Sequence, residues 1–594
     1  MRLLLTGNEA IARGAWESGV TAAFGYPGTP STEILENLVK YDGVYCEWSP
    51  NEKVALEAAA GASIAGARCI VTMKLVGLNV AADPLMTLSY VGVRGGLVVV
   101  VADDPGQHSS QTEQDTRHYA RLAKVPILDS ADAVDARAFM LEAFELSEKY
   151  GCPVILRTTT CVGHSRALVE CGEPRPKNVT EFRKEPSRFV PLPLWGRKLR
   201  VKVEERMDAQ SADASSHASL NHVIPGTAAD LGIITCGITA LYCRELMPEA
   251  PVLKLGWPWP FPDSMIREFA ASVKRVVVLE EGDPILEEHV RSLGIACSGK
   301  SDVVPRCGEL TPDRIFEIRE RLRGTNNELP KPFPQADGLP MRPPVFCPGC
   351  PHRALFYALT KFDVIVTGDI GCYSLAVFPP LERTDVLICM GGGFTLAHGL
   401  DIAGEKKKVV GVLGDSTFFH SGITGLLDVV YNKGTSTLIV VDNSSTAMTG
   451  HQDHPGTGRT ISGEPAPAAS IEAIARACGM KRVTVCDPFD QERLHKVLAE
   501  EIAADEPSLI ISKAPCPLQI RRRLGPVRAI DAAKCKKCKA CLKCGCPAIV
   551  VTADGKPAID PQLCSGCRLC ESVCKFGAIA PVASPDRKAD VPWK

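Results

Sequence analysis

The sequence has no long apolar segment, no marked excess of charge of either sign and no low-complexity tract. A membrane helix needs about 18 or more apolar residues in a row, and the longest apolar run, Leu97–Ala102, suits only a buried strand. Lys plus Arg number 67 and Asp plus Glu 69, a net charge of −2. This balance excludes a globally basic nucleic-acid binder and a highly charged disordered chain. The stretch Met1–Thr6 is too short for a secretory signal, so we expect a cytoplasmic protein.

The 594 residues, 45% hydrophobic and 23% charged, suit a globular protein of several domains. Apolar strand-like runs alternate with stretches rich in Ala, Glu and Leu, which predicts α/β domains with parallel sheets covered by helices. We predict such domains at 1–165, 229–323 and 345–527, linkers at 166–228 and 324–344, and a cysteine-rich domain at 528–582. The expected strands are Ala22–Tyr26, Cys69–Met73, Leu97–Ala102, Pro153–Arg157, Leu231–Thr235, Val276–Leu279, Val364–Thr367, Val409–Leu413 and Thr437–Val441.

Cysteine is the one residue type that is present in unusual number. The chain has 25 cysteines, and nine of them lie between Cys535 and Cys574. Because cytosolic cysteines are normally reduced, such a cluster indicates metal or redox chemistry rather than disulfides. Scattered cysteines such as Cys69, Cys152 and Cys236 lie beside apolar runs and are expected to be small buried hydrophobes.

Two cysteine runs in the tail predict two [4Fe–4S] clusters. The second run has the C-x2-C-x2-C-x3-C spacing of bacterial ferredoxins, in which the fourth cysteine of each run binds the other cluster. We therefore assign Cys535, Cys538, Cys541 and Cys574 to one cluster, and Cys546, Cys564, Cys567 and Cys570 to the other. Cys544 competes with Cys546 as a ligand, although Pro547 favours Cys546. Structural zinc is the alternative, but zinc ribbons use separated C-x2-C pairs.

The segment around these runs is basic. Arg528–Lys575 holds nine Lys or Arg and four acidic residues, a charge of +5 before any cluster is counted. Such a face could steer a small acidic electron carrier to the clusters. The alternative is ordinary solvated charge.

A carboxylate and an amide follow two strand-like runs in the third α/β domain. Asp415 follows Val409–Leu413, and Asn443 follows Thr437–Val441, 28 residues after Asp415. The carboxyl ends of parallel strands share one edge of a sheet, where ligands bind. Two side-chain oxygens and a backbone carbonyl, with water and phosphate oxygens, would suit Mg²⁺. A strand-end turn with an Asx cap is the alternative.

A glycine run precedes a helical stretch in the same domain. Met390 is followed by Gly391, Gly392 and a third glycine before Phe394. A glycine-rich turn that opens a helix can present free N–H groups to phosphate. We therefore expect Gly391 and Gly392 to bind a cofactor.

The strand-end pattern resembles the thiamine diphosphate motif, Gly-Asp-Gly followed by Asn-Asn, with departures at Ser416 and Ser444. The resemblance implies that Gly414, Asp415 and Asn443 bind the cofactor, with Mg²⁺ held by Asp415, Asn443 and the Ser445 carbonyl. In such enzymes a buried glutamate contacts N1′ of the aminopyrimidine, and Glu52, which opens a helix, is the matching residue. Its alternative is a favourable helix N-terminal charge.

The loop Tyr26–Ser31 resembles the Tyr-Pro-x-Thr-Pro-Ser loop of the 2-oxoacid:ferredoxin oxidoreductases, and the whole chain is similar to large subunits of the indolepyruvate branch. The resemblance is carried by Tyr26–Ser31, Asn51–Lys53, Gly414–Gly422, Thr446–Gln452 and Cys535–Cys546. It implies doubly wound sheets that bind the pyrimidine (1–165) and the diphosphate (345–527), a transketolase C-terminal-like domain (229–323) and a two-cluster ferredoxin-like tail.

The family chemistry implied is the oxidative decarboxylation of arylpyruvates to aryl-acetyl-CoA and CO2. The thiazolium carbanion attacks the ketone, CO2 leaves, two electrons pass singly through the clusters to ferredoxin, and coenzyme A takes the acyl group. Thr29, His420 and His451 are the expected substrate-pocket residues. A smaller beta subunit and self-association, as in an alpha2beta2 assembly, are implied partners. The alternatives are the same chemistry on another 2-oxoacid such as pyruvate, a non-redox thiamine decarboxylase, or a non-catalytic electron-relay subunit.

A third cluster beside thiamine is a further hypothesis. Related enzymes use a C-x2-C pair and two distant cysteines for it, and Cys347, Cys350, Cys372 and Cys516 match in order and approximate spacing. The alternative is that Cys347 and Cys350 belong to a structural turn.

Overall fold

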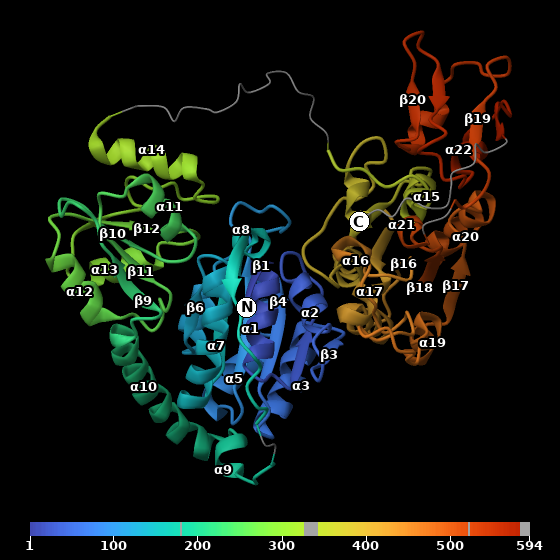
Figure 1. Cartoon of the computed structure of the whole chain (residues 1–594). Helices are drawn as coiled ribbons and strands as arrows, with labels where there is room; N and C mark the ends of the chain where they lie inside the picture. The colour runs from blue at the N-terminus through green and yellow to red at the C-terminus, as the bar shows by residue number, and fades with distance from the viewer. Residues whose placement is uncertain (179–180, 326–342, 521–522, 583–594) are drawn as a thin grey trace. The chain divides into compact units, whose positions relative to one another are not determined.

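The computed structural model describes residues 1–178, 181–325, 343–520 and 523–582. The chain forms two compact units, Met1–Ala336 (unit 1) and Asp337–Lys594 (unit 2), and in Figure 1 the colour runs continuously along both from blue at the N-terminus to red at the C-terminus. Within these described ranges, no helix combines the length and the apolar character needed to cross a bilayer.

Unit 1 contains a six-stranded parallel sheet in the order β3-β2-β4-β5-β7-β6. Its strands are β2 (Ala22–Gly25), β3 (Tyr45–Trp48), β4 (Cys69–Lys74), β5 (Leu97–Asp103), β6 (Ile127–Asp129) and β7 (Val154–Thr159). The central strand β5 is buried along its whole length, which explains its continuous apolar run. All four strands predicted for this domain are present, with ends shifted by at most two residues.

Helices cover this sheet, as the alternating pattern predicts. They are α1 (Gly7–Glu17), α2 (Thr32–Leu38), α3 (Glu52–Ile64), α4 (Leu75–Val80), α5 (Ala82–Val91), α6 (Thr116–Ala123), α7 (Ala133–Tyr150) and α8 (Thr160–His164). Local capping fixes their starts: Thr6 and Glu9 form a capping box at α1, and Asn51 accepts a hydrogen bond from the Val54 N–H at α3. Strands β1 (Arg2–Thr6) and β8 (Arg166–Glu170) form a separate two-stranded antiparallel sheet.

A second sheet in unit 1 has the order β13-β12-β10-β11-β9, parallel except for β9. Its elements are β9 (Asn221–Ile224), β10 (Gly232–Thr235), α11 (Thr239–Leu246), β11 (Val252–Leu255), α12 (Asp263–Ala271), β12 (Val276–Leu279), α13 (Ile285–Ser292), β13 (Cys297–Ser298) and α14 (Pro312–Arg323). All of these elements except β9 lie within the range 229–323 predicted for an α/β domain.

Residues 166–228 are more ordered than the linker that the sequence predicts. They contain β8, α9 (Pro186–Phe189), the 24-residue helix α10 (Pro193–Ser216) and β9, which is an edge strand of the second sheet. The buried positions of α10 are Leu199, Val203, Met207, Gln210 and Ala214. They recur at helical spacing on a mostly polar helix, so composition alone concealed the buried stripe. The second predicted linker, 324–344, lies mostly outside the described residues.

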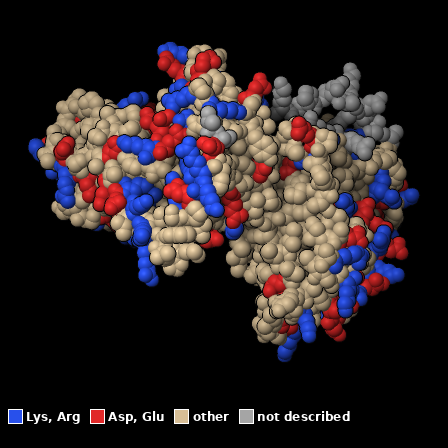
Figure 2. Space-filling view, turned by 90° about the horizontal axis from the view of Figure 1, so that it is seen from below, with Lys and Arg blue, Asp and Glu red and all other residues tan. Residues whose placement is uncertain are grey.

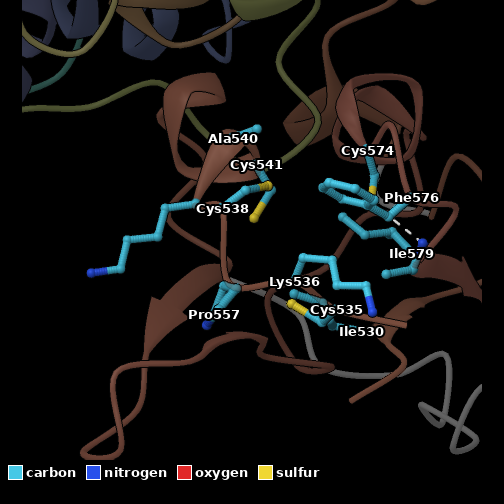
Figure 3. A pocket seen from close by; sticks show the side chains of 12 residues that line it. Ile530, Cys535, Lys536, Cys538, Ala540, Cys541, Pro557, Cys574, Phe576 and Ile579 are labelled. Atoms are coloured by element: carbon cyan, nitrogen blue, oxygen red, sulfur yellow. Dashed lines mark hydrogen bonds between the residues drawn. The ribbon is translucent and has the colours of Figure 1, made fainter. Parts of the chain in front are cut away.

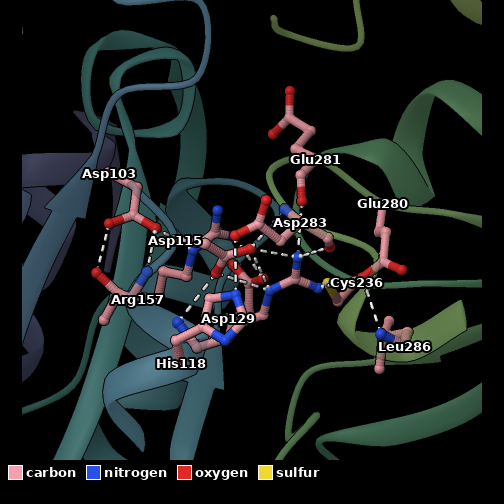
Figure 4. Close-up of polar contacts among 12 residues, drawn as sticks. Asp103, Asp115, His118, Asp129, Arg157, Cys236, Glu280, Glu281, Asp283 and Leu286 are labelled. Carbon is pink, nitrogen blue, oxygen red and sulfur yellow. Dashed lines mark hydrogen bonds and ion pairs between the residues drawn. The ribbon is translucent and has the colours of Figure 1, made fainter. Parts of the chain in front are cut away.

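A buried ionic cluster joins the two sheets of unit 1 (Figure 4). Arg117, from α6, pairs with Asp115 and with Glu280, which follows β12; both distances are 2.6 Å. Arg157, on β7, pairs with Asp103 at 2.7 Å and Asp129 at 2.8 Å. Separating the two domains would break the Arg117–Glu280 pair and leave buried charges uncompensated, which is costly. The cluster therefore holds the two domains of the unit together.

Unit 2 is built on a five-stranded parallel sheet in the order β14-β15-β16-β18-β17. The strands are β14 (Ile365–Thr367), β15 (Val409–Gly414), β16 (Thr437–Asp442), β17 (Arg482–Cys486) and β18 (Ser508–Lys513). The helices include α15 (Pro351–Leu359), α16 (Gly393–Ile402), α17 (Asp415–Thr417), α18 (Ile423–Tyr431), α19 (Ile471–Ala477), α20 (Gln491–Ala503) and α21 (Pro517–Ile520). The three strands predicted here are confirmed.

The cysteine-rich tail is part of unit 2 and has little regular structure. Its elements are β19 (Arg528–Ile530), the 3-10 helix η4 (Ala540–Cys544), β20 (Ile549–Val551), β21 (Pro557–Ile559), α22 (Leu569–Val573) and β22 (Ile579–Pro581). Strand β19 pairs with β22, and β20 with β21, both antiparallel. Figure 2 shows Lys and Arg interspersed with Asp and Glu on one face of the molecule, in keeping with the net charge of −2.

Candidate functional site

Unit 2 gathers its expected cofactor residues at the carboxyl edge of its sheet. Asp415 directly follows β15, and Asn443 directly follows the neighbouring strand β16. Both side chains are buried, as is Ser445, whose N–H donates to Asp415 Oδ2 at 3.2 Å. The structure therefore brings together the three residues expected to hold a metal ion.

The Asp415 carboxylate is held in its charged form. Burial alone would raise its pKa, but His454 Nε2, 3.3 Å from Oδ2, and N–H donors from Ser416 and Ser445 outweigh burial and lower it. His454 is itself oriented by the Gly456 N–H, which donates to its Nδ1 at 3.1 Å. A buried carboxylate kept ionised suits a cation ligand.

Asn443 has one satisfied and one unsatisfied side-chain atom. Its Nδ2 donates to His352 Nε2 at 3.2 Å, whereas its Oδ1 is buried without a hydrogen-bond partner among the described residues. Burial lowers the pKa of His352 to about 4, against the opposing influence of Asp415, so this histidine is a neutral acceptor at ordinary pH. Buried polar atoms are rarely left unpaired, so the orphaned oxygen fits a metal ligand.

The glycine run differs from its expected role. The N–H groups of Gly391 and Gly393 donate to the two oxygens of Asp369, at 3.0 and 2.9 Å, and the Gly392 N–H donates to the Cys389 oxygen at 3.1 Å. These three N–H groups are therefore not free for a phosphate, contrary to the sequence expectation. The carboxylate of Asp369, which follows β14, takes the place of an anion at the start of α16. Burial raises its pKa to about 6.

His420 and His451, the expected substrate residues of this unit, border the same edge. His420 is buried and lies 2.9 Å from the Ser421 hydroxyl through Nδ1, and its charge acts to lower the pKa of Asp369. His451 Nδ1 lies 3.4 Å from the Ser445 hydroxyl.

Unit 1 has a corresponding set at the carboxyl edge of its six-stranded sheet. The loop Tyr26–Ser31 follows β2, Glu52 opens α3 after β3, and Gly77 lies in α4 after β4. Glu52 is buried, with 6% of its surface exposed, and a Cβ on Gly77 would lie 2.5 Å from its Oε1. The absent side chain of Gly77 thus makes the room that the Glu52 carboxylate occupies.

The Tyr26–Ser31 loop is held by hydrogen bonds from its own Ser31, from Ser109 in the segment between β5 and α6, and from Asn8 in α1. The Ser31 hydroxyl donates to the Gly28 oxygen at 2.8 Å, and the Ser109 hydroxyl donates to the Thr29 oxygen at 3.2 Å. Asn8 Nδ2 donates to the Pro30 oxygen at 2.8 Å. Thr29 is therefore fixed through its backbone at the same sheet edge as Glu52.

The tail cysteines line two cavities. The first cavity is lined by Cys535, Cys538, Cys541 and Cys574 among others. In Figure 3, Cys535, Cys538 and Cys541 surround the open space together with Cys574 from the second run, and Lys536 lies at its border. The grouping is the one expected from the ferredoxin spacing.

The second cavity is lined by five cysteines, namely Cys544, Cys546, Cys564, Cys567 and Cys570. Both candidates for the fourth ligand, Cys544 and Cys546, thus reach the same cavity. Arg353, from α15, also lines it. In the described part of the chain, no three His, Cys, Asp or Glu side chains are placed to hold a single metal ion.

The four cysteines of the third-cluster hypothesis also interact with one another. Burial raises the pKa of the Cys372 thiol to about 11, and Cys516 and Cys347 add to the rise. Burial likewise raises the pKa of Cys350 to about 12, with a contribution from Cys372. The Cys516 N–H donates to the backbone carbonyl oxygen of Asn443 at 3.1 Å, so this cysteine set adjoins the Asp415–Asn443 edge.

Four site residues were missed by the sequence reasoning: Asp369, His352, His454 and Arg353. Asp369 had a detectable signal, because Gly368-Asp369 follows an expected strand just as Gly414-Asp415 does. His352 stands two residues after the C-x2-C pair, and His454 three after His451, but neither spacing carries a ligand pattern of its own.

Three family models match this chain. The thiamine diphosphate-binding domain of pyruvate flavodoxin/ferredoxin oxidoreductases matches residues 13–222, the C-terminal TPP-binding domain of thiamine pyrophosphate enzymes matches 369–512, and a 4Fe–4S binding domain matches 557–580. The class is therefore a thiamine diphosphate-binding oxidoreductase of 2-oxoacids with an iron–sulfur domain on the same chain.

Curated relatives define the family within that class. "Indolepyruvate oxidoreductase subunit IorA" of Methanothermobacter marburgensis is 42% identical over 98% of this chain and 97% of its own. The subunit of the same name from Archaeoglobus fulgidus is 39% identical over 98% of each chain. This chain belongs to the IorA family of indolepyruvate oxidoreductase subunits. Among solved structures, a 2-oxoglutarate:ferredoxin oxidoreductase from Magnetococcus marinus is 19% identical, with a TM-score of 0.45, over 54% of this chain and 65% of that one.

Proposed function

We propose that this chain carries out the oxidative decarboxylation of arylpyruvates, such as indolepyruvate and phenylpyruvate, to aryl-acetyl-CoA. One arylpyruvate and one CoA would yield one aryl-acetyl-CoA, one CO2 and one proton, while two oxidised ferredoxins each gain one electron. The observation that carries the proposal is the buried, unpartnered Asn443 oxygen next to Asp415, in the same unit as the cysteine-lined cavities. The arylpyruvate preference is supported by the names of the curated relatives.

Asp415, Asn443 and the Ser445 carbonyl are proposed to hold the Mg²⁺ of the cofactor diphosphate. The ionised carboxylate and the orphaned amide oxygen are hard oxygen ligands of the kind that Mg²⁺ prefers. His352 and His454 act through these two residues: each contacts one ligand side chain and orients it. Gly414 lets the chain turn beside the Tyr373 ring, since a Cβ there would lie 2.9 Å from Tyr373 Cε1.

When bound, thiamine diphosphate supplies the C2 carbanion that attacks the 2-oxo carbon and leads to loss of CO2. Glu52 is proposed as the residue that shares a proton with N1′ of the aminopyrimidine, because it is buried and held in place by its packing against Gly77. Thr29, His420 and His451 are proposed to contact the substrate. Their positions at the carboxyl edges of the two parallel sheets support this role.

The cysteines of the first and second cavities are proposed to hold two [4Fe–4S] clusters. Cys535, Cys538, Cys541 and Cys574 would bind the first, and Cys546, Cys564, Cys567 and Cys570 the second, with Cys544 as the competing ligand. Cys347, Cys350, Cys372 and Cys516 are proposed to bind a third. The contact between Cys516 and Asn443 supports this third site, because it adjoins the edge where thiamine would bind.

The proposed partners are ferredoxin, a smaller beta subunit and a second copy of this chain. Lys536 and Lys539 border the first cavity, and Cys538 is exposed there, which supports docking of an acidic carrier. Ile402 and Tyr431, at the ends of the packed helices α16 and α18, are 72% and 81% exposed. Large apolar side chains in such positions support association with another chain.

An anaerobic assay of the complex with its partner subunit tests the reaction. We expect ferredoxin reduction that needs CoA and is fast with indolepyruvate or phenylpyruvate and slow with pyruvate. Fast reduction with pyruvate alone would replace the arylpyruvate proposal by its main alternative, and no reduction with any 2-oxoacid would favour an electron-relay subunit. Iron analysis tests the clusters: about twelve irons per chain supports the third cluster, and about eight contradicts it.

A further inference from the structure

The side chain of Arg353 connects two cysteine-bearing segments of unit 2. It lies in α15 and has only 2% of its surface exposed. On one side, its Nη2 donates to the backbone oxygens of Phe346 and of Cys347, the latter at 3.2 Å. On the other side, its Nη1 donates to the backbone oxygens of Cys544, at 3.2 Å, and of Gly545. One guanidinium therefore fastens the turn that begins at Cys347 to the first cysteine run of the tail.

A second contact holds the same two parts together. The turn Cys347–Cys350 contains Gly349, which has a φ of +77°, and a Cβ there would lie 2.3 Å from the Ser565 hydroxyl oxygen. Ser565 lies between Cys564 and Cys567 of the second run. The proposed third cluster site and the second cavity are thus directly adjacent.

The unusual four-residue gap between Cys541 and Cys546 forms the surface that Arg353 binds. With four residues in place of the three of a ferredoxin run, the chain completes the 3-10 helix η4 and then turns at Gly545, which has a φ of +63°. This left-handed conformation, which favours glycine, presents two successive carbonyl oxygens to the guanidinium. A Cβ on Gly545 would also lie 2.9 Å from Pro380, so the turn is closely packed against the thiamine-binding domain.

The charge of Arg353 has no carboxylate to balance it in the described part of the chain. All four of its hydrogen bonds go to backbone oxygens, and its Nε is buried without a hydrogen-bond partner there. By contrast, Arg528, which lines the same cavity, is paired with Glu571 at 2.7 Å. Burying an unpaired cation is costly unless an anion lies close by.

Cysteine sulfurs are the nearest candidates for that anion, on both sides of the guanidinium. Arg353 lines the second cavity together with Cys544, Cys546 and Cys567, and on its other side it donates to the backbone oxygen of Cys347 at 3.2 Å. A [4Fe–4S] cluster with four thiolate ligands has a net negative charge, and local charge is one of the factors that set its potential. Two such clusters would balance the buried cation.

We infer that Arg353 is a positioning residue for electron transfer within the chain, fixing the third cluster site against the second cavity and stabilising the reduced clusters on either side. This inference rests on the proposed clusters. Each electron would leave the cluster at Cys347–Cys350, which is oxidised, and enter the cluster in the second cavity, which is reduced. Arg353 gains or loses neither an electron nor a proton. Its fixed charge favours the more negative, reduced form of both clusters.

The test uses the anaerobic holoenzyme as wild type, R353M, R353K and R493M. Arg493 is an exposed arginine on α20, a helix that packs against α15, and the cysteine on which its charge acts, Cys486, is assigned to no cluster, so R493M removes the same charge from outside the proposed cluster sites. Three quantities are measured: iron per chain, cluster midpoint potentials by EPR-monitored redox titration, and the rate at which the tail clusters are reduced after substrate and CoA are mixed in.

In R353M we expect the one-electron equilibria of the third cluster and of the cluster in the second cavity to shift about tenfold toward the oxidised form, a change of about 59 mV in midpoint potential. The potential of the cluster in the first cavity and the iron content should not change. R353K keeps the charge but not the planar fork that spans both pairs of carbonyls, so we expect near wild-type potentials and about tenfold slower electron arrival. R493M should match wild type in all three measurements.

Potentials in R353M equal to those in R493M would overturn the inference. If R353M loses iron, the R353K variant becomes the test. Reduction of the tail clusters at the wild-type rate in R353K would contradict the positioning role, and slow reduction at unchanged potentials would support it. A wild-type holoenzyme without iron or EPR signal would instead contradict the cluster proposal itself, which is a separate outcome.

Discussion

The side-chain nitrogen of Asn443 donates to Nε2 of His352 at 3.2 Å, and this contact leaves the Asn443 amide oxygen buried with no partner in the described chain. His352 thereby fixes which end of the amide is left to bind a cation. The histidine must be neutral to accept the bond. Its low pKa, about 4, keeps it neutral at any pH at which the enzyme would work.

Replacing His352 tests this orienting role. We expect H352A to weaken binding of thiamine diphosphate with Mg²⁺ about 10–100-fold, the usual cost of losing a residue that orients a metal ligand. Isothermal titration calorimetry of thiamine diphosphate with Mg²⁺ into the complex freed of both measures the affinity directly. H495A is the matched control, because His495 lies on α20 and packs against Phe362. Equal affinities of H352A and wild type would rule out the orienting role.

Gly77 is predicted to protect the position of Glu52. Because a Cβ at residue 77 would lie 2.5 Å from Glu52 Oε1, we expect G77A to lower the rate of ferredoxin reduction about 10²-fold through displacement of the carboxylate. Cluster absorbance should not change. Gly61, in α3 itself, has open space around its Cα, so G61A should keep full activity and be more stable by about 0.5–1 kcal/mol. Full activity in G77A would contradict this prediction, because it would show that the reaction tolerates a displaced Glu52 carboxylate.

Glu281 is predicted to make unit 1 less stable as the pH rises. Burial raises its pKa from 4.5 to about 7; Glu309 and Asp129 add to the rise, and the Leu310 N–H and Arg157 oppose it. The folded chain therefore binds this proton more tightly than the unfolded chain. The stabilising contribution is complete below pH 4.5 and is lost as the pH passes through about 7.

Thermal unfolding of wild type and E281Q between about pH 5 and pH 8 measures this effect. The glutamine stays neutral and can still accept the bond from Leu310, so we expect E281Q to lose less stability over this range than wild type does. E288Q, at an exposed position on α13, is the control and should follow wild type. Parallel curves for E281Q and wild type would contradict the prediction.

Much of this architecture could be predicted from the sequence. The buried strands are continuous apolar runs, and the cysteine spacing of a ferredoxin is constrained by the cluster itself, so β5 and the Cys564–Cys574 run were recognisable. The helix α10 was not, because its five buried positions are distributed over 24 mostly polar residues. In that helix, long-range packing rather than composition decides the structure.

The site was predictable only where a ligand follows a strand. Asp415, Asn443 and Glu52 do so, whereas His352, His454 and Arg353 act through partners that are distant in sequence. Arg353, for example, binds carbonyls 191 and 192 residues away. The glycine run was misread for a related reason: nothing local indicates that Asp369, more than twenty residues earlier, accepts its N–H groups.

The central claim is that Glu52 enables thiamine chemistry whose electrons leave through the cysteine-bound clusters. The most direct measurement is substrate-dependent reduction of ferredoxin by wild type and E52Q, each as the anaerobic complex with its partner subunit, with indolepyruvate and CoA. We expect E52Q to show no substrate-dependent reduction while its cluster absorbance and its reduction by dithionite equal those of wild type. Wild-type rates in E52Q would contradict the account.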